Sequence, residues 1–132
     1  MPLHQSQILL KVDMIFFEIP LTPDSADQTL DLVIEDVPYS FRVLWNERFQ
    51  YFSLSIAEKG GEDIITNAKM VAGYPLIRSE YAFPFAGNLY FLHRGGKKYR
   101  PTFDDIGKDT YGLFYYDDEI PLVYPLPLVP EI

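Results

Sequence analysis

Residues 28–57 read QTLDLVIEDVPYSFRVLWNERFQYFSLSIA, and this stretch decides the fold. Large apolar side chains take alternate positions in three consecutive runs: Leu30, Leu32 and Ile34, then Tyr39, Phe41, Val43 and Trp45, then Phe52, Leu54 and Ile56. A period of two is typical of half-buried strands. The polar links at 35–36 and 46–48 have hairpin length. The stretch therefore predicts a three-stranded antiparallel meander.

Four further strands are predicted around this meander, at residues 14–19, 63–71, 88–93 and 110–116. Pro20 ends the first of them, because proline cannot donate to a strand ladder. No stretch carries a sustained helical stripe with caps. We therefore expect an all-β fold, a small antiparallel barrel or sandwich built on the meander. With 132 residues and no internal repeat, the chain should form one β domain, at residues 14–117.

The two ends are predicted to lie outside this domain, as an N-terminal extension at residues 1–13 and an extended, apolar, Pro-rich tail at residues 118–132. Within the tail, residues 120–132 read IPLVYPLPLVPEI, and the prolines exclude a helix or a central strand. A disordered tail should be polar, and this one is not. It should therefore lie against either its own domain or a neighbouring subunit. The predicted interface residues of the tail are Leu122, Tyr124, Leu126 and Leu128.

A second candidate interface is the aromatic segment at residues 72–87, which breaks the strand pattern. Two explanations stay open, a flap that covers an open end of a barrel and a loop that contacts another protein. The aromatic residues that would make the interface are Tyr74, Tyr81, Phe83 and Phe85.

Composition excludes several classes of function. The formal net charge of −8 argues against a phosphate-backbone binder, and the basic cluster at residues 94–100 is predicted to be a solvated hairpin loop. The chain has no cysteine, which excludes disulfides and thiol chemistry. It also lacks a signal-peptide pattern and a long apolar run, so we expect a protein assembled in a cytoplasm, with no membrane contact.

The acidic residues Asp104, Asp105 and Asp109 are the nearest thing to a catalytic set. They could bind a hard cation for hydrolysis, but acidic pairs beside glycine are typical of turns, and we predict a turn. His4 and His93 have no companion ligand motif. We therefore predict no enzyme activity, no metal site and no cofactor.

Four short segments, in this order, carry a resemblance to a known family: FFEIPLTP at 16–23, LWN at 44–46, PTFDDIG at 101–107 and LFYYD at 113–117. Over residues 16–117 the chain resembles the baseplate plug family of contractile-tailed bacteriophages, of the cyanophage-like type. The resemblance implies a structural virion protein in the central baseplate hub. It would plug the tail tube channel before contraction, as a symmetric homo-oligomer against hub, spike and tube-initiator proteins.

The chain departs from the family pattern in its longer ends, at residues 1–13 and 118–132, which leaves its station in the baseplate open. An alternative function is a soluble β-sandwich module that binds a carbohydrate or another small ligand through the aromatic loop at residues 74–85.

Overall fold

A computed structural model describes residues 16–77, 87–97, 99–107, 110–116, 122–126, 129 and 131 of the chain. These residues form strands and one short 3₁₀ helix, η1. The elements are β1 (Phe16–Ile19), β2 (Asp27–Ile34), β3 (Val37–Asn46), β4 (Tyr51–Glu58), β5 (Asp63–Lys69), β6 (Asn88–His93), η1 (Phe103–Asp105) and β7 (Tyr111–Tyr116).

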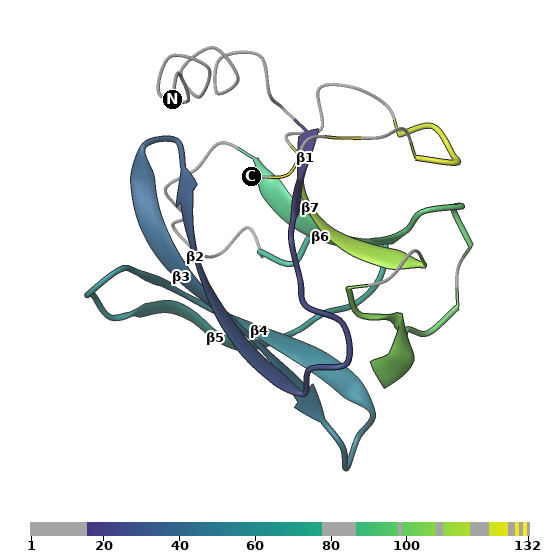
Figure 1. Cartoon of the computed structure of the whole chain (residues 1–132), viewed down its shortest axis with the longest axis horizontal. Helices are drawn as coiled ribbons and strands as arrows, with labels where there is room; N and C mark the ends of the chain where they lie inside the picture. Colours follow the sequence, from purple (N-terminus) through teal and green to yellow (C-terminus); the bar gives the residue numbers. More distant parts are fainter. Residues whose placement is uncertain are drawn as a thin grey trace.

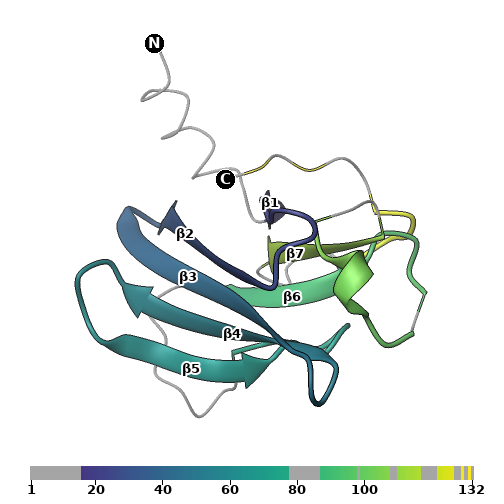
Figure 2. The same ribbon diagram turned by 60° about the horizontal axis from the view of Figure 1, so that its bottom comes forward.

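The strands make two antiparallel sheets, one with the order β2-β3-β4-β5 and one with the order β1-β7-β6 (Figures 1 and 2). The predicted meander is confirmed as the first three strands of the larger sheet. The all-β prediction is also confirmed, in its sandwich-like form, since neither sheet closes into a barrel. The flap considered for residues 72–87 has no closed barrel to cover in this fold, and residues 78–86 of that segment lie outside the described residues.

Turn residues explain the register of the meander. Glu35 and Asp36 both have positive φ, at 51° and 69°, and both-positive central residues define the primed turn that suits a two-residue hairpin. The prediction that residues 46–48 connect β3 to β4 is wrong, because the connection lies further along the chain. Asn46 pairs with Tyr51, so the connection between β3 and β4 is residues 47–50. The Asn46 side chain accepts a hydrogen bond from the Phe49 amide, at 3.0 Å, which orders this loop.

The main core lies between the two sheets. Alternate residues of β3 and β4, including Phe41, Val43, Phe52 and Ile56, pack against inward residues of β6 and β7 such as Leu89, Phe91 and Leu113. The aromatic content of the sequence is used here: Phe52 contacts Trp45 in its own sheet and Phe91 in the opposite one, with ring centroids 4.7 and 6.3 Å apart.

The smaller sheet is buried on both faces, because every residue of β7 is buried. Its outer face carries Tyr90, Leu92, Phe114 and Tyr116. Half-buried apolar residues pack against this second cluster, and three of them come from the C-terminal segment: Leu122, Leu126 and Val129. The Leu126 amide also donates to the Arg94 carbonyl, at 2.7 Å. These described residues of the segment therefore lie on the chain's own sheet.

The two edges of the smaller sheet are each covered by another segment of the chain. Glu131 forms a parallel bridge with Glu18 of β1. On the β6 side, Ala72 and Pro75 bridge to Phe91 and Tyr90. The larger sheet ends at β2 and β5. The β4–β5 pairing contains register shifts, and Asn67 of β5 has a positive φ of 52°.

The described residues contain no helix that is long and apolar enough to cross a membrane.

Candidate functional site

A cavity of about 770 Å³ opens where the ends of β5 and β6 meet the C-terminal segment. Tyr74, Leu122 and Tyr124, three of the predicted interface residues, all line it. They come from two segments, the aromatic loop and the C-terminal tail, which the sequence predicted as separate candidate interfaces. The structure thus joins part of the aromatic loop and part of the tail in one site.

The lining is basic and aromatic. Lys69, Lys97, Arg100 and His93 contribute nitrogen groups, and Tyr51 and Tyr99 join the two tyrosines already named. Among the described residues, no Asp or Glu lines the cavity. This is unusual for a chain with 19 acidic and 11 basic residues. The cavity is therefore a local basic region on an acidic protein.

Three aromatic rings pack together at one wall of the cavity. Tyr99, Tyr111 and His93 contact one another edge to face, with centroids 5.2–5.4 Å apart. The Tyr111 hydroxyl donates to the Tyr99 carbonyl. Burial raises the pKa of Tyr111, and partial desolvation and the nearby Asp105 carboxylate raise the pKa of Tyr99, whose side chain stays partly exposed. Both hydroxyls therefore keep their protons at neutral pH.

Gly96 allows Tyr124 to lie against this wall. Its φ is +80°, and a Cβ built on it would lie 2.6 Å from Cγ of Tyr124. Any side chain at position 96 would displace the tyrosine.

The basic cluster at residues 94–100 is more than a solvated hairpin loop. Arg94 forms an ion pair with Glu18 of β1, and its guanidinium lies 5.4 Å from the Phe114 ring. Arg100 donates to the carbonyls of Phe49 and Gln50, at 2.6 and 3.0 Å. The connection also spans residues 94–110 and includes η1, so it is much longer than a tight hairpin.

Asp105 organises a turn, as predicted. Its carboxylate accepts hydrogen bonds from the Thr102 amide at 2.7 Å and from the Thr102 and Thr110 hydroxyls at 3.2 and 2.9 Å. These donors occupy the oxygen atoms that a cation would need. Asp109 lies outside the described residues, and the part of the chain that is described contains no group of three metal-ligating side chains.

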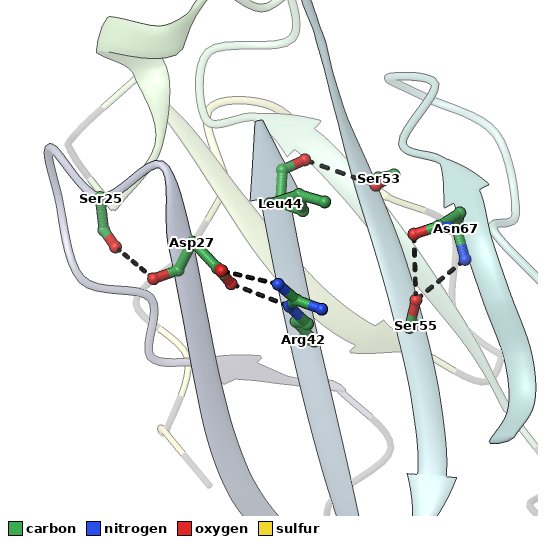
Figure 3. Close-up of polar contacts among 7 residues, drawn as sticks. All are labelled: Ser25, Asp27, Arg42, Leu44, Ser53, Ser55 and Asn67. Carbon is green, nitrogen blue, oxygen red and sulfur yellow. Dashed lines mark hydrogen bonds and ion pairs between the residues drawn. The ribbon is translucent and has the colours of Figure 1, made fainter. Parts of the chain in front are cut away.

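The outer face of the larger sheet is polar (Figure 3). Arg42 forms two hydrogen bonds with Asp27, at 2.9 and 2.7 Å. Hydrogen bonding to Arg42 is the main cause that lowers the pKa of Asp27. Ser55 accepts a hydrogen bond from the Asn67 amide, and Ser53 contacts the Leu44 carbonyl. These serines contact amide and carbonyl groups, which do not activate a hydroxyl as a nucleophile.

Residues 16–130 match the family model described as cyanophage baseplate Pam3 plug gp18. This match covers most of the chain. The chain belongs to this baseplate plug family. As a member of the plug family it is a structural component of a phage tail baseplate, in agreement with the resemblance seen in the sequence. A search of the curated proteins found no match.

Of the other predicted interface residues of this plug-family chain, one lies among the described residues and four lie outside them. Leu126 is half-buried against the outer cluster of the smaller sheet. Tyr81, Phe83, Phe85 and Leu128 lie outside the described residues. Trp45, which the sequence placed in the core, is buried there, and its indole N–H donates to Glu47 at 3.1 Å.

Sequence reasoning missed Lys69, Lys97, Tyr99 and Arg100 as members of a site. Three of them fall in the basic cluster, whose composition was the available signal. Lys69 gave no signal, because nothing in the sequence places the end of β5 beside residues 97–100.

Proposed function

We propose that the chain assembles in the central hub of a contractile phage tail baseplate and closes the tail tube channel before contraction. Membership of the baseplate plug family is the observation that carries this proposal. In this role the chain performs no reaction. It forms permanent contacts with hub, spike and tube-initiator proteins, in a symmetric set of copies.

The physical features of the chain support such a role. The body is a two-sheet sandwich whose core combines aliphatic and aromatic side chains from both sheets. Asp105 is engaged by the threonines of its own turn, and Ser55 by the backbone of β5, so neither side chain is arranged for catalysis. A net charge of −8 also keeps DNA from adhering to a protein near the DNA conduit.

The proposal is tested with a phage in which a stop codon interrupts this gene. We expect particles that lose DNA prematurely or tails that fail to mature, measured by density-gradient banding, electron microscopy and released DNA. Expression of the full chain in trans should restore both. Intact, DNA-retaining particles without the chain would refute a plugging role.

We propose further that the domain boundaries are residues 14–117, with the ends at 1–13 and 118–132 serving attachment. Deleting residues 121–132 uncovers the outer cluster of the smaller sheet, so it should lower the melting temperature while leaving a folded domain by circular dichroism. It should also reduce incorporation into tails, measured by quantitative mass spectrometry. Normal incorporation of a folded, truncated chain would contradict the attachment role of the tail.

A ligand-binding module remains the second candidate, because Tyr74 lines a cavity of a size that holds small ligands. A sugar that raises the melting temperature of the purified chain would favour this function. A chain that is stabilised only by baseplate partners would favour the first.

A further inference from the structure

The basic, aromatic cavity described above is the feature of the molecule that the family membership does not account for. We propose that it is the docking site for an extended acidic segment of another baseplate protein. This inference rests on the proposed function, which supplies the setting in which such a partner is met.

The charges of the cavity are the first observation. The three ion pairs between described residues use Arg42, Lys59 and Arg94, and each pairs with an Asp or Glu of the same chain. None of these three cations lines the cavity. By contrast, Lys69 lies over the Tyr51 ring at 5.0 Å, and Arg100 contacts backbone carbonyls. Within the described chain, the cavity therefore gathers cations that form no ion pair with a described carboxylate.

The second observation is the exposed apolar surface. The described chain leaves seven large apolar side chains exposed, and four of them line this one cavity. These are Val71, Tyr74, Tyr99 and Tyr124, with exposed fractions of 42%, 66%, 42% and 41%. Tyrosine and arginine are the residues enriched in the energetically dominant parts of protein interfaces. Exposed apolar groups that are gathered in one place mark an interaction site more reliably than scattered ones.

The chemistry of the occupant follows from these two observations. Carboxylates complement Lys69 and Lys97, while the tyrosines offer flat apolar faces and hydroxyl donors. Charge complementarity excludes a basic partner. A nucleic acid would also meet lysines and tyrosines, but its many phosphates would be repelled by the net charge of −8 on the rest of the chain. A short acidic polypeptide segment carries fewer charges and can fit within the basic region.

The charge test compares two sets of variants in phage tails. Lys69→Glu with Lys97→Glu should lower incorporation at least tenfold, measured by quantitative mass spectrometry of purified tails. Lys59→Glu with Arg48→Glu makes the same charge change, −4, at residues that do not line the cavity, and this control should incorporate within twofold of wild type. Circular dichroism and melting temperature of the isolated variants establish that each is folded. Incorporation of the folded double variant at the wild-type level would overturn the docking proposal.

The aromatic test uses Tyr74→Ser, with Phe49→Ser as its control. Phe49 is exposed to 58% and does not line the cavity. We expect the first variant to lose incorporation at least fivefold and the second to retain it. Equal effects of the two variants would overturn a role for the cavity surface.

The partner is identified by photo-cross-linking in assembled tails, with p-benzoyl-L-phenylalanine in place of Tyr74. We expect a cross-link to a peptide of a different baseplate protein that carries more Asp and Glu than Lys and Arg. Changing those acidic residues to lysine should restore incorporation of the Lys69→Glu, Lys97→Glu variant. A cross-link to DNA, to a second copy of this chain or to a basic peptide would overturn the proposal. Absence of the wild-type chain from tails would instead refute the proposed function itself.

Discussion

At the scale of single residues, the pair Asp27–Arg42 is an exposed contact between two neighbouring strands. Asp27 is the first residue of β2 and Arg42 lies in the middle of β3, and two hydrogen bonds join their side chains. Both side chains are about half exposed, with 49% and 53% of their surface accessible. Such pairs contribute little to stability, so their clearest signature is the titration of the carboxylate.

We expect the Arg42→Gln substitution to raise the pKa of Asp27 toward its ordinary value. The lowered pKa in the folded wild type means that the pair stabilises the fold above the unfolded pKa of about 4. That contribution is lost as the pH falls through the lowered value. The stability difference between wild type and variant should therefore be present at pH 7 and vanish in strong acid. Carboxyl-detected NMR titration and urea unfolding at several pH values measure both effects. An Arg48→Gln control should leave the titration of Asp27 unchanged.

Residue-level prediction from sequence succeeded where the cause is local. The turn at Glu35 and Asp36, the loop role of Asp105 and the core position of Trp45 each depend on neighbours within a few positions. The ion pair of Glu18 with Arg94 could not be predicted, because 76 residues separate the partners and they meet only when β7 pairs with both β1 and β6.

At the scale of elements, the meander was predictable because its hairpins join strands that are adjacent in sequence. The order β1-β7-β6 was not, because it pairs the first strand with the last. The sequence YGLFYY of β7 does not alternate between apolar and polar residues, because both faces of the smaller sheet are covered. The hydrophobic pattern of a strand indicates whether one or both faces of its sheet are buried, but it does not indicate which segment covers each face.

The C-terminal segment is the covering element, and its contribution can be measured. Replacing both Leu122 and Leu126 by serine removes two half-buried apolar contacts with the outer cluster. We expect a loss of about 2 kcal/mol in the free energy of unfolding, from the apolar area returned to water. Urea unfolding measures it.

The matched control for this substitution is the neighbouring Val123→Ser. Val123 is 70% exposed, so its replacement should change stability by less than about 0.5 kcal/mol. An equal loss in the control and in the double variant would mean that the segment does not rest on the sheet through Leu122 and Leu126.

At the scale of the whole molecule, the two sheets and η1 behave as one unit because the same side chain links them. Phe52 of β4 contacts Trp45 of β3, Phe91 of β6 and Phe103 of η1. Only 2% of its surface is exposed. Its removal therefore weakens contacts in both layers at once.

We expect Phe52→Ala to lower the free energy of unfolding by about 3–5 kcal/mol, a large share of the roughly 5–15 kcal/mol that stabilises a domain. Unfolding should remain a single transition by tryptophan fluorescence and by circular dichroism. Phe49→Ala, at an exposed loop position, should have little effect. Two separate transitions in the variant would indicate that the sheets unfold independently.

The cavity also belongs to this scale, which is why the sequence did not reveal it. Its cationic groups come from Lys69, Lys97 and Arg100, and its tyrosines from four separate segments. The sequence predicted Tyr74 and Tyr124 as interface residues in two different surfaces, and the structure places both in the lining of one cavity. Their proximity depends on the pairing of residues 72–75 with β6 and on the return of the C-terminal segment.

The arrangement of the strand edges has a consequence for how tails are built. Within the described chain, both borders of the smaller sheet are occupied by the chain itself, and β5 at one border of the larger sheet is irregular at Asn67. Irregular or covered borders disfavour pairing between free copies. We therefore expect these three borders to resist edge-to-edge pairing of free copies, so that polymerisation through them would not compete with addition to a growing tail.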